Sequence, residues 1–212
     1  MFDFPNSTTL PQPIVGQSVQ PPLRAKVAFD KVMAVLLLLP LVVCALTLIL
    51  LNPVLNKGPL LFMQRRMGQD CKPFTMIKFR TMRVAKPARG AFEPLDADRV
   101  TPLGQFLRRC RIDELPQVLN VLRGDMSLIG PRPDCYDHAR VYLRDVPGYA
   151  ARQSALPGIS GYAQVKLGYI DDIHAMHRRV AADLYYIAHA SFAFDMRIAW
   201  HTVIVVLGRQ GA

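Results

Sequence analysis

The residues of this chain that could do chemistry are concentrated in one stretch, Arg108 to Pro133, which reads RRCRIDELPQVLNVLRGDMSLIGPRP. Two adjacent carboxylates, Asp113 and Glu114, lie between a basic run and a Pro-Arg-Pro turn at residues 131–133. Guanidinium groups hold phosphate oxygens through paired hydrogen bonds, and carboxylates beside them can hold a divalent ion that bridges to a phosphate. This combination indicates a site for phosphate chemistry.

The two carboxylates should have different roles, because side chains at adjacent helical positions do not face the same way. One could attack phosphorus or take a proton while the other binds a metal ion. The surrounding arginines are expected to keep Asp113 ionised at neutral pH, as a nucleophile must be. The structural alternative is that Asp113 and Glu114 only cap the start of a helix and complement its dipole.

A short helix is expected to position this pair. Leu115 precedes Pro116, and a residue before proline is pushed away from helical angles, so the helix is expected to start at Pro116. The apolar residues that follow fall on one face, and Gly124 is a plausible stop. Asp113 and Glu114 would then lie just ahead of the helix N-terminus.

Two short β-type runs, Leu60 to Met63 and Phe74 to Phe79, predict a small hairpin or sheet. Lys78 and Arg80 project from the second run. From the local pattern alone they are expected to be solvated charges that face anionic lipid. Further along, Thr101 and Pro102 are typical of a helix start, with threonine as the cap.

Two other patterns are weaker. The glycine-rich run Leu156 to Gly161 predicts a turn whose N–H groups could receive a phosphate. His174 and His177 lie three residues apart on an expected helix, a spacing compatible with two metal ligands. No third ligand is evident near them, so ordinary histidines on a polar face are favoured.

A run of twenty uncharged residues, Val32 to Leu51, is long enough to cross a bilayer as a straight helix. Pro40 lies near its middle and is expected to break it. Basic residues flank both ends, with Arg24, Lys26 and Lys31 on one side and Lys57, Arg65 and Arg66 on the other. Both ends are therefore expected on the cytoplasmic side. A re-entrant helix-break-helix satisfies this, and a kinked full span is the alternative.

Composition limits the kinds of partner. The 212 residues suit one domain with an appendage, and the formal net charge of +10 indicates an anionic partner. Aromatic residues are not interleaved with the basic runs, which argues against nucleic acid. Residues 1–23 are rich in Pro, Gln, Ser and Thr and predict a flexible tail. We expect a membrane helix over 24–52 and a cytosolic catalytic domain over 53–212.

Three segments together resemble the bacterial sugar transferase family, the small monotopic phosphoglycosyl transferases. They are KFRTM at Lys78 to Met82, the LRRCRIDELPQVLNVLRGDMSLIGPRP stretch, and LPGISGYAQV at Leu156 to Val165. The resemblance covers about Lys26 to Ala212. It implies an α+β, mostly helical fold, with a re-entrant membrane helix, amphipathic interface helices and a small β-hairpin or sheet.

The resemblance also implies a reaction: transfer of a sugar 1-phosphate from a UDP-sugar to polyprenyl (undecaprenyl) phosphate, with release of UMP. Asp113 would form a covalent phosphosugar intermediate, and Glu114 would hold Mg²⁺ beside Asp113. Arg108 and Arg132 would clamp phosphates, and Lys78 and Arg80 would lie close to the substrate phosphates or the carboxylate pair. The enzyme would act on the cytoplasmic leaflet of the bacterial inner membrane and initiate glycan or exopolysaccharide assembly. The oligomeric state stays open, with a homodimer as one option.

Two rival functions fit the same residues. One is a membrane-bound, Mg²⁺-dependent phosphatase or pyrophosphatase, in which water is the acceptor. The other is a non-enzymatic membrane adaptor whose basic face binds anionic lipid or protein.

Overall fold

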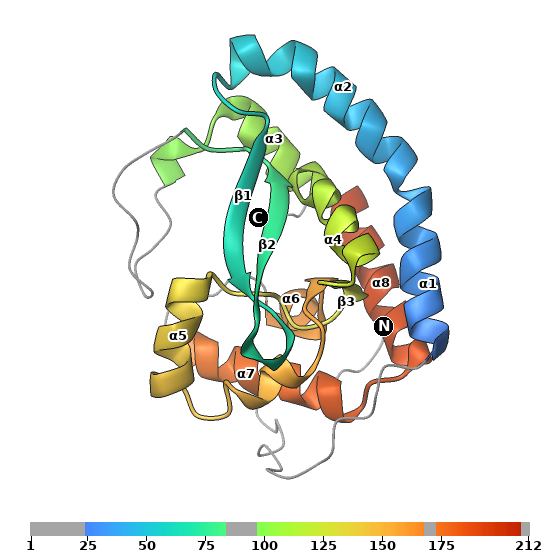
Figure 1. Ribbon diagram of the computed structural model, residues 1–212, viewed down its shortest axis with the longest axis vertical. Coiled ribbons are helices and arrows are strands. Elements are labelled where there is room, and N and C mark those ends of the chain that lie inside the picture. Colours follow the sequence, from blue (N-terminus) through green and yellow to red (C-terminus); the bar gives the residue numbers. More distant parts are fainter. Residues whose placement is uncertain (1–23, 84–96, 168–172, 209–212) are drawn as a thin grey trace.

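The computed structural model describes residues 24–83, 97–167 and 173–208, and the expected N-terminal tail at 1–23 lies outside them. The fold is mostly helical, as expected, and it has two small two-stranded sheets, of which only the first was predicted (Figure 1). The elements are α1 (Arg24–Leu36), α2 (Leu38–Leu55), β1 (Leu61–Met67), β2 (Pro73–Phe79), α3 (Pro102–Arg109), η4 (Ile112–Gln117), α4 (Val118–Arg123), β3 (Ser127–Ile129), α5 (Tyr136–Asp145), β4 (Gly158–Ser160), α6 (Tyr162–Leu167), α7 (Ile173–Ala188) and α8 (Phe192–Leu207).

The predicted hairpin is confirmed, with longer strands than expected. Strands β1 and β2 pair in antiparallel register from Leu61 opposite Phe79 to Met67 opposite Pro73. Asn120 of α4 joins the other edge of β2, because its side-chain oxygen accepts from the Ile77 N–H at 3.2 Å. Its amide nitrogen donates to the Thr75 carbonyl at 2.8 Å. These bonds fix β2 against α4, next to the segment that carries the carboxylate pair.

The N-terminal apolar run forms two helices that meet at Leu37, one turn before Pro40 (Figure 1). A proline removes the hydrogen bond to the carbonyl four residues earlier and its ring crowds that carbonyl. For Pro40 this carbonyl belongs to Leu36, the last residue of α1. The break predicted at Pro40 therefore lies upstream of the proline that causes it.

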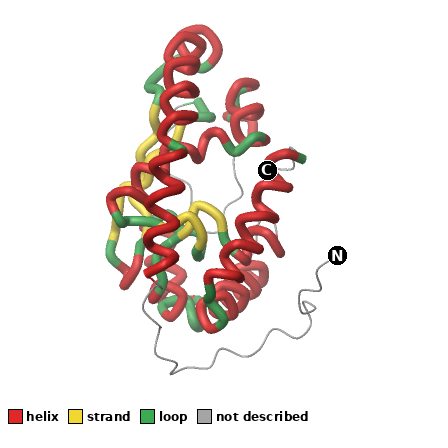
Figure 2. The backbone as a smooth tube through the Cα atoms, turned by 90° about the vertical axis from the view of Figure 1, so that its right-hand side faces the viewer, coloured by secondary structure: helices red, strands yellow, loops and turns green. Residues whose placement is uncertain are grey.

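One stripe of this helix pair is part of the protein core. Ala34, Leu41 and Leu48, seven residues apart, are buried in a cluster with Met76 and Val118 of the hairpin and α4. Figure 2 shows the α1–α2 pair following one side of the molecule.

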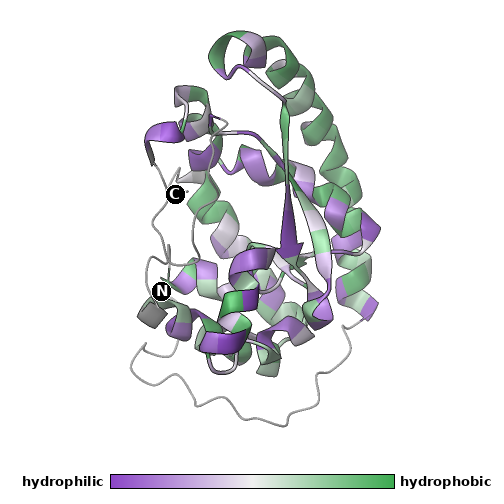
Figure 3. Ribbon diagram, turned by 60° about the vertical axis from the view of Figure 1, so that its left-hand side comes forward, coloured by the Kyte–Doolittle hydropathy of each residue, from purple (hydrophilic) through white to green (hydrophobic). Residues whose placement is uncertain are grey.

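The opposite stripe of the pair is apolar and exposed. Leu39 is 73% and Leu50 is 78% exposed, and Figure 3 shows α2 as largely hydrophobic. Within the described ranges, Arg24–Leu55 is the one helical stretch whose length and composition would allow it to cross a membrane. Its exposed side has the character of a lipid-facing surface.

Two of the charges that were expected to flank a membrane segment contact the domain instead. The Lys26 ammonium donates to Asp195 of α8 at 2.7 Å. The Lys31 ammonium donates to the carbonyls of Val121 at 2.8 Å and Leu122 at 2.5 Å, in the last turn of α4. A cation is favoured at a helix C-terminus. These lysines attach α1 to the domain. Their positions are therefore explained by these contacts and are weaker indicators of the cytoplasmic side than the sequence suggested.

The glycine-rich run expected to be a turn is a strand. Strand β4 pairs in parallel with β3, and the Gly158 N–H donates to the Pro131 carbonyl at 2.9 Å, so it is not available to a phosphate. The glycines permit close contact. A Cβ at Gly158 would lie 2.1 Å from the Gly130 nitrogen, and one at Gly161 would lie 2.2 Å from the Gly130 oxygen.

The C-terminal helices complete the fold. The predicted helix containing His174 and His177 is α7, and His177 is exposed. Over the parts of the chain that the structure covers, no group of three potential metal ligands occurs. The apolar C-terminal run forms α8, in which Ile198 is buried and Trp200 is 62% exposed.

Replacing Gly158 with alanine is expected to destabilise the protein far more than Gly124→Ala. Gly124 has φ +91° but open space around it, so alanine there costs only backbone strain, about 1–2 kcal/mol. The added carbon at Gly158 must displace the backbone of Gly130, which we expect to cost about 3 kcal/mol or more. Thermal unfolding of both variants in one detergent tests this, and equal shifts of the midpoint would contradict the close contact.

Candidate active site

The carboxylate pair lies inside the 3-10 turn η4, which leads directly into α4, whereas the α-helix was expected to start at Pro116. The turn starts after Arg111, whose φ of +55° is left-handed. Because Pro116 cannot donate to the Ile112 carbonyl, the chain here adopts the tighter three-residue bonding pattern. The α-helical part begins only at Val118 and ends at Gly124, the predicted stop.

Glu114 is buried and held by cations from three segments. Its Oε1 accepts from Lys78 of β2 at 2.9 Å and from Arg132 at 2.7 Å. Arg111 lies 3.5 Å from Oε2. Burial alone would raise the pKa of Glu114, but the charges and hydrogen bonds of Arg132 and Lys78 hold it well below its usual range. Glu114 is therefore a permanent anion at physiological pH.

Asp113 differs from its neighbour in its electrostatics. It is 8% exposed, and burial, followed by the charge of Glu114, raises its pKa to about 6 against the opposing charges of Lys78, Arg132 and Arg108. The arginines were expected to keep Asp113 ionised, and desolvation raises its pKa by more than these cations lower it. At pH 7 Asp113 is still ionised by about ten to one.

Lys78 is the cation most affected by the site. Burial lowers its pKa to about 8, although the negative charge of Glu114 opposes this change. It is still largely protonated at pH 7, and it becomes neutral within the range in which enzymes are commonly assayed. The predicted closeness of Lys78 to the carboxylate pair is thus present in the structure.

Arg132 reaches the pair from the Pro-Arg-Pro turn. Two guanidiniums, those of Arg152 and Arg179, donate to its carbonyl at 2.8 Å and 2.6 Å. Arg66 donates to the Pro133 carbonyl at 3.1 Å. The turn is thereby fixed from both sides, and the Arg132 side chain remains 33% exposed.

The same two arginines belong to a buried ion network that sequence reasoning missed. Asp134 accepts from Arg152 at 2.5 Å, from Arg179 at 2.9 Å and from the Tyr149 hydroxyl at 2.8 Å. Arg152 also donates to Asp183 at 2.8 Å. Burial would raise the pKa of Asp134, but the two arginines hold it well below its usual range. Nothing in the local pattern distinguishes these residues from ordinary helix charges.

The other two predicted phosphate ligands have different surroundings. Arg108 donates to the Thr81 hydroxyl at 3.0 Å, and its charge acts on Asp113. Arg80 instead donates to carbonyls that follow α2, those of Pro59 at 2.7 Å and Asn56, and to Met82 at 3.1 Å. Strand β2 ends at Phe79, so the alternation that would have placed Arg80 beside Lys78 no longer applies. Its donors hold the backbone rather than the carboxylate pair.

The chemistry of the pair fits a magnesium ion. Mg²⁺ binds carboxylate oxygens and retains positions for phosphates and water. Among the described residues, the only ion pair of Glu114 Oε2 is the 3.5 Å contact with Arg111, so this oxygen keeps capacity for a metal. Asp113 is the second hard oxygen donor at the site.

A buried carboxylate with a raised pKa, a second carboxylate held by cations and a long apolar helix are features that suit phosphate chemistry beside a membrane. Comparison with known proteins makes the class specific. The sequence model of the family described as "Bacterial sugar transferase" matches residues 22–209. The chain belongs to this family.

Curated relatives carry related names. A UDP-N-acetylgalactosamine-undecaprenyl-phosphate N-acetylgalactosaminephosphotransferase of Aeromonas hydrophila is 41% identical over 85% of the chain and 42% of its own length. A UDP-glucose:undecaprenyl-phosphate glucose-1-phosphate transferase of Caulobacter vibrioides is 44% identical over 74% of the chain and 60% of its own length. An exopolysaccharide production protein of Rhizobium leguminosarum is 38% identical over 88% of the chain and 95% of its own length. The chain thus spans about two fifths to three fifths of the first two relatives and nearly all of the third.

Substitutions of the two carboxylates should have opposite effects on stability. The folded pKa of Asp113, about 6, lies above its ordinary value of 3.8, so ionisation costs folding stability as pH rises through this window, at most about 3 kcal/mol. Asp113→Asn should therefore raise the unfolding midpoint at pH 7.5 and change it little at pH 4. Glu114→Gln leaves Lys78 buried without its counter-charge and should cost about 3–5 kcal/mol at pH 7.5. Thermal melts at both pH values test this, and a loss of stability in Asp113→Asn would contradict the assigned electrostatics.

Proposed function

We propose that this protein transfers a sugar 1-phosphate from a UDP-sugar to a polyprenyl phosphate such as undecaprenyl phosphate, with release of UMP. It would act at the cytoplasmic face of a bacterial inner membrane, at the start of glycan or exopolysaccharide assembly. The observation that carries the proposal is the electrostatic asymmetry of the pair. The negative charge of Glu114 is compensated by Lys78 and Arg132, which both donate to it. Asp113 has a pKa of about 6. The names of the relatives supply the substrate class.

The first step forms a bond between Asp113 and phosphorus. A carboxylate oxygen attacks the phosphorus that bears the sugar, the bond from that phosphorus to the bridging oxygen breaks, and UMP leaves with the electron pair. The product is an acyl phosphate that joins Asp113 to the sugar phosphate. A carboxylate with a pKa of about 6 is both ionised at pH 7 and more basic than an ordinary aspartate, which suits a nucleophile.

The surrounding cations would stabilise the charge that moves during this step. Lys78 and Arg132 contact Glu114, so a diphosphate that reaches Glu114 also meets both cations. Arg108 lies on the Asp113 side. Glu114, with Asp113 beside it, would hold Mg²⁺, which when bound neutralises the diphosphate and stabilises the leaving group.

The second step regenerates the enzyme. An oxygen of the polyprenyl phosphate attacks the same phosphorus, the bond to Asp113 breaks, and the product is a polyprenyl diphosphate sugar. This acceptor enters from the membrane, so the site must lie beside lipid. The exposed apolar stripe of α1–α2 supports that position, since the opposite stripe packs under the hairpin and α4.

We further propose that α1–α2 enters and leaves through one leaflet. The helix pair is bent at Leu37, and Lys26 and Lys31 dock α1 on the domain. A helix that packs on its own catalytic domain along one stripe cannot be surrounded by lipid across a whole bilayer. These features favour the re-entrant form over a kinked span.

The decisive measurement is UMP release by the purified full chain in nanodiscs with Mg²⁺, across a panel of UDP-sugars, with and without undecaprenyl phosphate. We expect lipid-dependent turnover with one sugar, and a stoichiometric burst of UMP without lipid if the intermediate forms. Asp113→Asn should reduce turnover by at least about a thousandfold. Asp137→Asn, which makes the same change at an exposed position of α5, is the matched control.

The rival functions give different results in this assay. Continuous UMP or phosphate release without lipid would indicate a phosphatase or pyrophosphatase. Absence of UMP with every sugar, from protein shown to be folded, would reject the UDP-sugar assignment and favour the adaptor.

The rate of the UMP burst should show a bell-shaped dependence on pH. It should rise as Asp113 ionises near pH 6 and fall as Lys78 loses its proton near pH 8, since their pKa values are about 6 and about 8. Lys78→Arg keeps the charge but does not titrate in this range, so it should lose only the alkaline limb. A burst rate independent of pH between 5 and 7 would argue against Asp113 as the nucleophile.

A further inference from the structure

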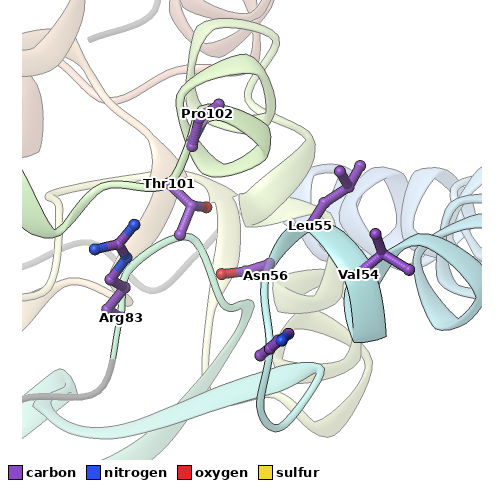
Figure 4. A pocket seen from close by; sticks show the side chains of 7 residues that line it. Val54, Leu55, Asn56, Arg83, Thr101 and Pro102 are labelled. Atoms are coloured by element: carbon purple, nitrogen blue, oxygen red, sulfur yellow. The ribbon is translucent and has the colours of Figure 1, made fainter.

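A pocket that does not include Asp113 or Glu114 lies at the C-terminal end of α2. Its volume is about 400 Å³ (Figure 4). Its walls come from the end of α2 with the residues that follow it, and from the segments on either side of the 84–96 gap. The lining residues are Val54, Leu55, Asn56, Lys57, Arg83, Thr101 and Pro102. None of the residues assigned to the transfer reaction lines it.

Asn56 is the polar group that the protein leaves unsatisfied there. It is 3% exposed, and its amide nitrogen donates to the Arg80 carbonyl at 2.7 Å, which fixes the orientation of the amide. The side-chain oxygen is buried and has no hydrogen-bond donor. Figure 4 shows this oxygen directed toward the side of the pocket where Thr101 and Arg83 lie. A buried acceptor without a partner is costly, so a ligand that supplies an N–H or O–H would be favoured.

Two cations give the pocket affinity for an anion. Lys57 and Arg83 are exposed, and neither forms an ion pair with another described residue. Helix α3 also begins at the pocket, at Pro102, so the positive end of its dipole faces the same space. The pocket therefore offers positive charge from both of its walls and an acceptor oxygen, that of Asn56, at the end of α2.

The remaining wall is apolar and belongs to the exposed stripe of α2. Val54 is 75% and Leu55 is 50% exposed. Lys57 follows immediately, so the pocket lies where apolar surface gives way to positive charge. In a membrane protein this change marks the level at which acyl chains meet headgroups.

We propose that this pocket binds a phospholipid whose phosphodiester headgroup carries a hydrogen-bond donor, an ammonium or a hydroxyl. The phosphate would lie between Lys57 and Arg83, the donor would bind the side-chain oxygen of Asn56, and an acyl chain would lie along Val54 and Leu55. A polyprenyl phosphate matches less well, because its terminal phosphate presents oxygens to an oxygen. The proposal is independent of the sugar transfer reaction.

The test compares lipids that differ only in the headgroup, bound to the full chain. Native mass spectrometry in detergent would measure the affinity of phosphatidylethanolamine, phosphatidylglycerol and phosphatidylcholine with identical acyl chains. Phosphatidylethanolamine and phosphatidylcholine are both zwitterions, but only the first has N–H donors. We expect it to bind about tenfold more tightly, the effect of one satisfied buried acceptor. Tighter binding of phosphatidylglycerol than of phosphatidylethanolamine, with both above phosphatidylcholine, would identify a hydroxyl as the donor.

Charge-matched variants locate the site. The double variant Lys57→Gln/Arg83→Gln should lose the preferred lipid about tenfold or more. Lys72→Gln/Arg140→Gln removes two exposed cations elsewhere and should bind as the wild type does. Asn56→Leu, if it folds, should abolish the preference over phosphatidylcholine, and the lipid series on the wild-type chain tests the same point if it does not. Equal binding of all three lipids, or equal losses in the two double variants, would overturn the proposal.

Discussion

The buried carboxylate of Glu114 holds the site together, because the groups that neutralise it come from separate parts of the chain. Lys78 belongs to the hairpin, Glu114 to the 3-10 turn and Arg132 to the turn after β3. The Glu114 carboxylate accepts from Lys78 at 2.9 Å and from Arg132 at 2.7 Å. A buried charge without its partners is strongly unfavourable. The three segments therefore stabilise one another when assembled, and Glu114 fixes the positions of Lys78 and Arg132.

This arrangement separates the roles of two carboxylates that are adjacent in sequence. Lys78 and Arg132 donate to Glu114, and Asp113 is left with a pKa raised by burial to about 6. The ion network of Asp134, Arg152 and Arg179 helps to hold Arg132 in place, since both arginines of the network also donate to the Arg132 carbonyl. Packing and charge around the pair thus determine which of the two carboxylates has the higher pKa.

The sequence was informative where the cause is local. The Thr101 cap is confirmed, since its hydroxyl accepts from the Gly104 N–H at 3.0 Å, and so are the hairpin and the Gly124 stop. It was misleading where contacts are distant. The strand β4 needs β3 as a partner, Arg80 is captured by carbonyls at the end of α2, and the burial that raises the pKa of Asp113 depends on the whole domain. The site residues themselves remain predictions, although Lys78, Arg132 and Arg108 do surround the pair.

The stripe formed by Ala34, Leu41 and Leu48 has a consequence for how this protein can come into being. Those side chains fill the same core as Met76 and Val118, so residues 24–52 and 53–212 differ in their surroundings but share one interior. A version cut after the apolar helix would expose that interior to water, and it should aggregate rather than give a soluble enzyme. The core of the domain is then complete only after α1 and α2 have packed onto it.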